Sequence, residues 1–221
     1  MLEVEVLPDP EAVAERGAEH IAEFARAAVE DHGLFTFAVS GGHVPWEMFR
    51  HLIGKMPWEK VTIYQVDERI VPEDDPQRNL KLLKRSLPPG GASDVHSMLV
   101  WVHDLEGAAA AYARSLPEQL DLIHLGLGPD GHTASLVPGD PVLDVTDRRV
   151  AITGEYDGHR RMTLTYPVLN AARHILWLVT GDDKVDALRR LRAGDRSIPA
   201  GRVASEHAIL VADAAAIGGD T

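Results

Sequence analysis

The sequence contains no cysteine, so disulfide bonds, thiolate metal sites and cysteine nucleophiles are all excluded. It also has no apolar run that approaches the roughly 20 residues needed to cross a bilayer. The first residues, MLEVEVLPDPEAVAERG, are acidic and lack the basic and apolar regions of a secretory signal peptide. We therefore expect a cytoplasmic protein that has no membrane partner.

Positive charge is also scarce in this chain. Lys and Arg number 22 against 34 Asp and Glu, which gives a net charge of −12. Such a chain repels nucleic acids and anionic membranes, so neither is expected as a partner. If the protein binds an anionic small molecule, a few cations must gather locally against this unfavourable overall charge.

The chain has 221 residues, and a chain of this length can bury roughly 70% of its unfolded surface in one sizeable core. No internal repeat, low-complexity tract or Pro/Ser-rich linker divides it, so residues 1–221 are expected to form a single domain. We also expect a monomer, because no exposed apolar stripe stands out in the sequence.

Short apolar runs alternate with amphipathic stretches along the whole sequence. This pattern predicts an α/β fold with a mostly parallel sheet and helices on both faces. The expected strands are residues 4–7, 35–39, 61–66, 122–127, 162–165, 175–180 and 208–211, and the expected helices are residues 10–32, 45–53, 77–87, 105–115 and 182–191.

Two loops that follow early strands contain candidate binding residues, because parallel sheets bind ligands at the carboxyl ends of their strands. Gly41 and Gly42 precede a predicted helix, and a glycine turn at a helix N-terminus is an anion site. A tight turn without function would look the same. The triplet Asp67-Glu68-Arg69 follows the next strand and is either part of a site or a solvated charged turn.

The stretch GLGPDGH contains Gly126, Gly128 and Gly131 and so matches the dinucleotide-binding pattern G-x-G-x-x-G. A dinucleotide loop opens a long helix, commonly near the start of its domain. This stretch begins past residue 120, and Pro138-Gly139 would stop any helix after about two turns. We therefore do not expect a nucleotide cofactor here.

Asp130 and His132 lie on either side of Gly131 and suggest an active site instead. Histidine titrates near neutrality and can take a proton from water, and a nearby carboxylate can fix its tautomer. The alternative is a capping aspartate beside a surface histidine, one of 11 in the chain. The glycine-rich setting at the ligand-binding edge favours catalysis.

Two further cations lie in the second half of the chain. Arg161 directly precedes the strand predicted at residues 162–165, and Lys184 lies in the first turn of a predicted helix. A cation at a helix N-terminus opposes the helix dipole, which indicates that Lys184 meets an anion unless it is an ordinary surface lysine.

Taken together, these loops resemble the 6-phosphogluconolactonase family over nearly the whole chain. The stretch from Gly126 to Leu136 is the most specific part of the resemblance, whereas the charged triplet or the glycine turn alone would be weak. The residues that carry the resemblance are, in chain order, Ser40-Gly41-Gly42 with Pro45, Asp67-Glu68-Arg69 with Pro72, Asn79, the stretch from Gly126 to Leu136 with Pro138-Gly139, Arg161 to Thr165, Gly181 with Lys184, and Pro199-Ala200 with Arg202-Val203.

The resemblance implies a modified Rossmann-like fold and hydrolysis of 6-phospho-D-glucono-1,5-lactone to 6-phospho-D-gluconate, a step of the oxidative pentose phosphate pathway. It implies no metal and no nucleotide cofactor. His132 would activate water, Asp130 would orient His132 or shape its loop, and Asp67 is a weaker candidate for contacting sugar hydroxyls or water. Backbone N–H groups of the glycine loops would hold the oxyanion.

For the substrate phosphate, the resemblance implies a set of cationic and polar groups. The expected binding residues are Gly41, Gly42, His43, Arg69, Asn79, Arg161 and Lys184. Two positions depart from the family pattern. Val44 stands where a hydroxyl residue is common, so His43 or backbone amides would compensate, and Arg78 stands where serine is common.

Two alternatives remain beside the lactonase interpretation. A glucosamine-6-phosphate deaminase or isomerase resembles the chain in the glycine turn and the Gly-His core, but it carries a glutamate where this chain has Val137. A non-catalytic sugar-phosphate binding protein would keep the cations, yet it would not need Asp130 and His132.

Overall fold

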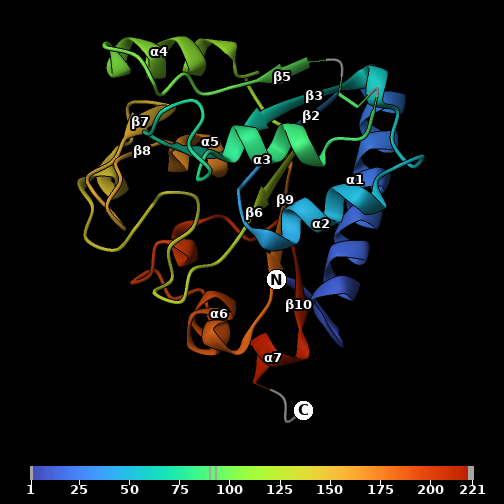
Figure 1. The fold of residues 1–221 in the computed structure, drawn as a ribbon. Coiled ribbons are helices and arrows are strands. Elements are labelled where there is room, and N and C mark those ends of the chain that lie inside the picture. Colours follow the sequence, from blue (N-terminus) through green and yellow to red (C-terminus); the bar gives the residue numbers. More distant parts are fainter. Residues whose placement is uncertain (1, 90, 93, 219–221) are drawn as a thin grey trace.

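The computed structural model describes residues 2–89, 91–92 and 94–218, apart from the side chain of His43. Its centre is a seven-stranded sheet with the strand order β1-β10-β9-β6-β2-β3-β5 (Figure 1). All neighbouring strands in it are parallel, as the sequence predicts. Its strands are β1 (Glu3–Leu7), β2 (Phe35–Val39), β3 (Val61–Gln65), β5 (Asp94–His96), β6 (Leu122–Leu125), β9 (His174–Val179) and β10 (Ala208–Asp213).

A second, antiparallel sheet contains β4 (Asp67–Arg69), β8 (Arg161–Leu164) and β7 (Val150–Ile152) in that order. The strand expected at residues 162–165 therefore exists, but it lies outside the parallel sheet. The charged triplet, expected as a loop, is itself a strand. It pairs with β8 because the chain leaves the parallel sheet at Val66, whose carbonyl accepts a hydrogen bond from the Leu164 amide at 2.9 Å.

The helices cover both faces of the parallel sheet, which confirms the predicted architecture. In Figure 1, α1 lies on the right of the sheet and β7 and β8 lie on its left. Residues of α1 and α2 form one apolar core with the sheet, and residues of α4, α6 and the small sheet form another. The helices are α1 (Pro10–His32), α2 (His43–His51), α3 (Asn79–Ser86), α4 (Leu105–Ser115), α5 (Tyr166–Leu169), α6 (Val185–Arg192) and α7 (Ala214–Ile217).

The ends of α1 show why the sequence predicted this helix so well. The Asp9 side chain accepts a hydrogen bond from the Ala12 amide at 2.9 Å and so caps the first turn. Gly33 ends the helix with a φ of 84°, a conformation that glycine adopts without strain. No helix in the described part of the chain is long and apolar enough to span a membrane.

The strand order reverses between β2 and β6, and this reversal positions the site. From β2 the chain continues to β3 and β5 on one side, whereas β6, β9 and β10 follow on the other. The loops after β2 and β6 therefore diverge at the carboxyl edge of the sheet. Open α/β sheets bind their ligands at such a switch point.

One polar side chain interrupts the apolar face beneath α1 and α2. His124 on β6 lies beside Val39 and Leu176 in the sheet register and is completely buried. Neither ring nitrogen has a hydrogen-bond partner among the described residues. Burial lowers the pKa of His124 from 6.5 to about 3, so the ring is neutral in the folded protein.

We predict that His124→Leu keeps or raises the stability of the protein at pH 7.5 and weakens its acid sensitivity. Below pH 6.5 the unfolded chain takes up a proton at this residue while the folded chain does not. The stability of the folded protein therefore decreases as the pH is lowered. The loss is about 2 kcal/mol between pH 7.5 and pH 5. Leucine does not titrate, so this pH-dependent loss disappears. It also removes two buried nitrogens that have no hydrogen-bond partner in the part of the chain that the structure describes, which keeps or raises the stability at pH 7.5.

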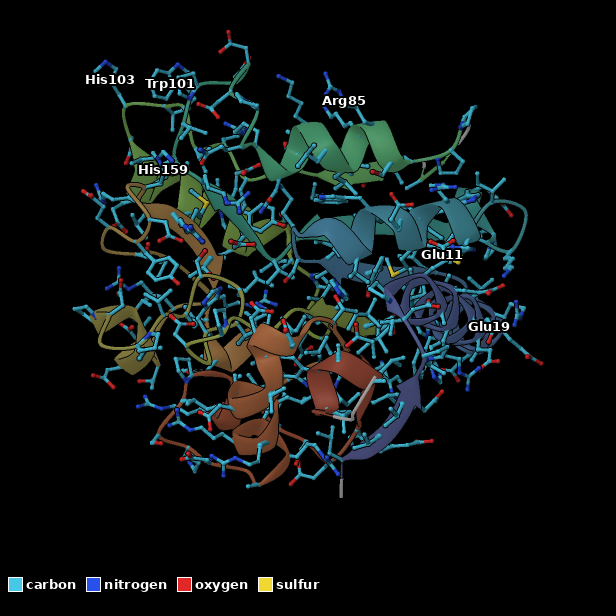
Figure 2. The ribbon with its side chains drawn as sticks, turned by 60° about the horizontal axis from the view of Figure 1, so that its bottom comes forward. Glu11, Glu19, Arg85, Trp101, His103 and His159 are labelled. Atoms are coloured by element: carbon cyan, nitrogen blue, oxygen red, sulfur yellow. The ribbon has the colours of Figure 1, made fainter. Side chains whose placement is uncertain are left out.

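Urea unfolding at the two pH values measures this difference. His103→Gln is the matched control, since His103 is an exposed residue that projects from the surface before α4 (Figure 2). The control should keep the pH dependence of the wild type. If His124→Leu loses as much stability on acidification as the wild type, the buried ring is not the cause.

Candidate active site

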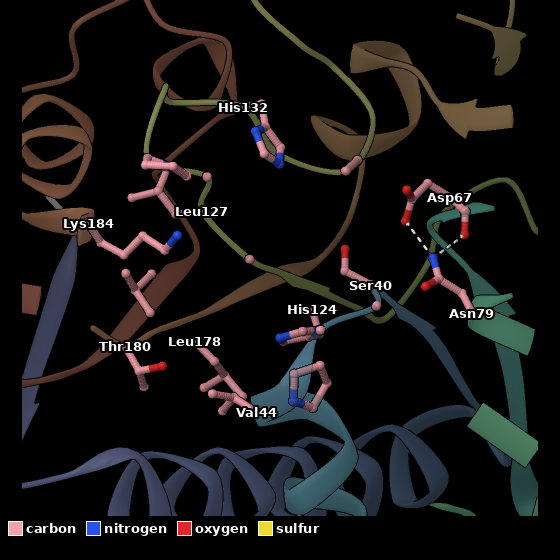
Figure 3. A pocket seen from close by; sticks show the side chains of 18 of the residues that line it. Ser40, Val44, Asp67, Asn79, His124, Leu127, His132, Leu178, Thr180 and Lys184 are labelled. Carbon is pink, nitrogen blue, oxygen red and sulfur yellow. Dashed lines mark hydrogen bonds between the residues drawn. The ribbon is translucent and has the colours of Figure 1, made fainter. Parts of the chain in front are cut away.

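A cavity of about 440 Å³ opens where the loops after β2 and β6 diverge. Figure 3 shows His132, Lys184 and Asp67 on different sides of it, with His124 beneath. The cavity brings together most of the residues singled out in the sequence. Its lining includes Gly41, Gly42, Asp67, Arg69, Asn79, His132, Arg161 and Lys184.

The loop after β6 is a tight turn that places the His132 ring against the backbone of Gly128. The Gly128 amide donates to the His132 carbonyl at 2.9 Å, and the Gly131 amide donates to the Gly128 carbonyl at 3.0 Å. A Cβ on Gly128 would lie only 2.1 Å from Nδ1 of His132. Residues 129–139 form turns and no helix, so these glycines do not open a dinucleotide-binding helix, and Gly128 leaves room for the histidine ring.

Asp130 and His132 form a hydrogen-bonded pair at the wall of the cavity. Asp130 Oδ1 lies 2.6 Å from His132 Nδ1 and accepts from the His132 amide at 3.1 Å. Partial burial raises the pKa of Asp130, but the hydrogen bonds and charge of His132 outweigh this and hold the pKa below its usual value. Asp130 is therefore a carboxylate at neutral pH. His132 itself lines the cavity, whereas Asp130 lies behind it.

Tyr156 joins this pair and is a residue that the sequence did not single out. Its hydroxyl donates to Asp130 Oδ2 at 3.1 Å and lies 3.4 Å from His132 Nδ1. The rings of Tyr156 and His132 meet edge to face, with their centroids 5.3 Å apart. Asp157-Gly158 is a hairpin signal, but nothing in the sequence indicates that this hairpin folds onto Asp130.

Arg69 and Arg161 face each other across the small sheet. They are directly opposite in the register of β4 and β8, which places their side chains on the same face. Arg161 is buried, and this burial lowers the pKa of its guanidinium while the Asp67 carboxylate partly offsets the effect. Neither arginine forms a salt bridge with a described carboxylate, unlike Arg78, which pairs with Glu68. Two adjacent cations without an acidic partner favour an anionic ligand.

Asp67 and Asn79 connect this arginine pair to the glycine turn. Asp67 Oδ2 accepts from the Ser135 hydroxyl at 2.6 Å, and Asn79 Nδ2 donates to Asp67 Oδ1 at 3.3 Å. Asn79 Oδ1 accepts from Arg69 at 2.7 Å. A Cβ on Gly41 would lie 2.2 Å from that same oxygen, so only glycine fits at this approach.

The middle residue of the triplet, Glu68, has a structural position away from the cavity. Its fully buried carboxylate accepts from the amides of Asn79 and Leu80, each at 2.8 Å, and so caps the start of α3. The Arg78 guanidinium lies 3.3 Å from it. The departure at Arg78 therefore has a physical reason, because this buried arginine balances the charge of Glu68.

The remaining predicted residues lie at the opposite wall of the cavity. Lys184 is in a short turn, Asp182–Lys184, that precedes α6, and its Nζ donates to Asp183 Oδ2 at 2.6 Å. Val44 lines the cavity and offers no polar group of its side chain to a ligand. The predicted contact of His43 concerns a side chain outside the described part of the structure.

Comparisons with known proteins show which proteins this chain is similar to. A 6-phosphogluconolactonase of Rhizobium meliloti is 35% identical over 205 residues, covering 87% of this chain and 88% of that protein. A 6-phosphogluconolactonase of Nostoc sp. is 34% identical over 208 residues, covering 86% of this chain and 85% of that protein. The crystal structure of 6-phosphogluconolactonase from Thermotoga maritima is 27% identical, has a TM-score of 0.86 and covers 96% of this chain and 99% of its own.

A family model described as "Glucosamine-6-phosphate isomerases/6-phosphogluconolactonase" matches residues 8–212, which include both sheets apart from the edge strand β1 and the end of β10. The match takes in the glycine turn, the charged triplet, the Asp130–His132 loop and Arg161. The chain therefore belongs to the family of glucosamine-6-phosphate isomerases and 6-phosphogluconolactonases.

Proposed function

We propose that this protein is a 6-phosphogluconolactonase, a hydrolase that opens 6-phospho-D-glucono-1,5-lactone to 6-phospho-D-gluconate, with residues 1–221 acting as one domain. The observation that carries the proposal is the Asp130–His132 pair at a cavity that also holds two adjacent arginines. The relatives named 6-phosphogluconolactonase support it. A monomeric state and a cytoplasmic location remain predictions from the sequence.

The Asp130–His132 hydrogen bond determines which ring nitrogen acts. With the proton on Nδ1 held by the carboxylate, Nε2 of His132 has a free lone pair. In the proposed reaction, Nε2 takes a proton from water while the water oxygen bonds to the lactone carbonyl carbon. Asp130 stabilises the imidazolium that forms.

Ring opening then completes the reaction. The bond between the former carbonyl carbon and the ring oxygen breaks, and the imidazolium returns its proton to that oxygen. Backbone N–H groups of the glycine loops would stabilise the oxyanion that develops on the carbonyl oxygen. Asp67 would contact the sugar hydroxyls, since its carboxylate lines the cavity and is fixed by Ser135.

The phosphate of the substrate would bind to Arg69 and Arg161. A guanidinium presents parallel N–H donors that match phosphate oxygens, and both guanidinium groups lie on one face of the small sheet. Lys184 would add a compact charge from the opposite wall, in exchange for its contact with Asp183. The turn at Gly41 and Gly42, which also lines the cavity, offers backbone N–H groups to the phosphate.

The loop after His132 disfavours deaminase chemistry. Leu136 and Val137 are both buried and apolar, so the position where the resemblance implies a catalytic glutamate in the deaminases provides no acid or base. A purely sugar-phosphate-binding role would leave the ordered Asp130–His132 pair without use.

The wild-type protein should accelerate hydrolysis of freshly generated 6-phosphogluconolactone well above its spontaneous opening, without added metal or nucleotide. His132→Gln should lower kcat by about 100-fold or more, because general acid–base catalysis commonly contributes 10²–10⁴-fold. Binding of the product should persist. His103→Gln is the control and should match the wild type. Equal turnover by His132→Gln and wild type would refute the assignment of the base, and ammonia release from glucosamine 6-phosphate would favour the deaminase.

Arg161→Gln should raise KM for the phosphorylated lactone by about 10- to 100-fold, which is the loss expected for a hydrogen bond to a charged group. The KM of this variant for glucono-1,5-lactone, which has no phosphate, should change much less. The matched control is Arg160→Gln, since Arg160 is the exposed neighbour and does not line the cavity. If Arg161→Gln affects both lactones equally, Arg161 does not bind the phosphate.

A further inference from the structure

Tyr156 lies where the proposed base and the proposed phosphate site meet. Its hydroxyl reaches the far oxygen of Asp130, and its ring lies edge to face with the ring of His132. The guanidinium carbon of Arg161 lies 5.1 Å from the centre of the same ring, within the range of a cation–π contact. One side chain therefore touches the base, the carboxylate that orients the base, and a buried cation.

The backbone fixes this ring in position. The Tyr156 amide donates to the His159 carbonyl at 3.0 Å, and the His159 amide donates back at 3.2 Å. Asp157 and Gly158 between them have φ values of 50° and 75°, as in the tight hairpin turn that Asp-Gly favours. Arg161 follows in β8, where its amide donates to the Thr153 hydroxyl at 3.0 Å.

The charges around Tyr156 make its hydroxyl a donor at neutral pH. Partial burial raises the pKa of the phenol, and the neighbouring charge of Asp130 and the hydrogen bond to it add to the increase. The charged groups that face the phenol are Asp130, His132, Asp157 and Arg161. The hydroxyl draws negative charge toward Oδ2 of Asp130, the oxygen that does not bind His132 Nδ1.

We propose that Tyr156 is a positioning residue for the reaction, in which its hydroxyl holds Asp130 on His132 and its ring holds Arg161 against the phosphate. The proposal rests on the lactonase function proposed above. The two parts of the side chain have separate consequences, since the hydroxyl acts on the base and the ring acts on the cation. Substitutions can therefore test them separately.

Tyr156→Phe removes the hydroxyl and keeps the ring. We expect kcat to fall about fivefold, the value of one ordinary hydrogen bond, with KM unchanged within twofold. The acid limb of the pH profile of kcat/KM should move to higher pH by a few tenths of a unit, because Asp130 then keeps more charge and stabilises the imidazolium more strongly.

Tyr156→Leu removes the ring as well. In this variant KM for the phosphorylated lactone should rise by a further two- to fivefold, at least the loss of a cation–π contact at a partly exposed ring. KM for glucono-1,5-lactone should not show this further rise. Tyr64→Phe is the matched control, since its hydroxyl donates to the Ser115 carbonyl at 3.1 Å and the residue does not line the cavity. Its kinetics should equal those of the wild type.

The outcomes separate the two proposals. If the wild type does not hydrolyse the lactone, the proposed function fails. If the wild type is active and Tyr156→Phe keeps its kcat and its pH profile, the hydroxyl has no positioning role. A fall in kcat without a shift of the acid limb, in a protein that unfolds at a lower temperature, would show a merely structural role and would also overturn the proposal. If Tyr156→Leu has the same KM for the phosphorylated lactone as Tyr156→Phe, the ring does not hold Arg161 against the phosphate, and that part of the proposal is overturned.

Discussion

The 2.6 Å hydrogen bond between Asp130 and Nδ1 of His132 is the interaction on which the proposed chemistry depends. In the proposed reaction this bond keeps the proton on Nδ1 and leaves a free lone pair on Nε2. His132 lines the cavity, and Asp130 does not. Two hydrogen bonds fix the loop that holds the pair. The Thr133 hydroxyl donates to the Gly126 carbonyl at 2.9 Å, and the Ala200 amide donates to the Gly131 carbonyl at 3.0 Å. The close packing of the ring on Gly128 leaves no room for a side chain there.

The topology explains how an acidic chain concentrates positive charge. After β3 the chain leaves the parallel sheet and crosses to the small sheet, so that Arg69 is directly opposite Arg161. Like charges that face each other across strands destabilise a sheet in the absence of a ligand. Glu68 in the middle of β4 stabilises this strand, because its buried carboxylate pairs with Arg78 and accepts a hydrogen bond from the first residue of α3. In the proposed function, the bound phosphate would offset this repulsion.

The sequence predicted the parallel sheet because its strands are apolar runs, and it predicted α1 and α4 to the residue; in both helices an aspartate side chain caps the first turn. It missed β4, β5 and β7, which have only three residues each and are too short to show a strand pattern. Asp130 and His132 could be recognised as a pair because they are neighbours in the chain. Tyr156 could not, because it is 24 residues from His132 and reaches it only through tertiary packing. Likewise, the sequence left open whether Glu68 belongs to a site or to a solvated turn, because its partners on α3 are brought to it only by the fold.

The tautomer of His132 tests the central claim most directly. Nitrogen chemical shifts of 15N-histidine-labelled protein, with His132→Gln used to assign the signal, report which ring nitrogen carries the proton. The account predicts a proton on Nδ1 and a lone pair on Nε2 in the neutral ring, and a loss of this preference in Asp130→Asn. A neutral ring that carries its proton on Nε2 in the wild type would contradict the account, because that nitrogen could not take a proton from water.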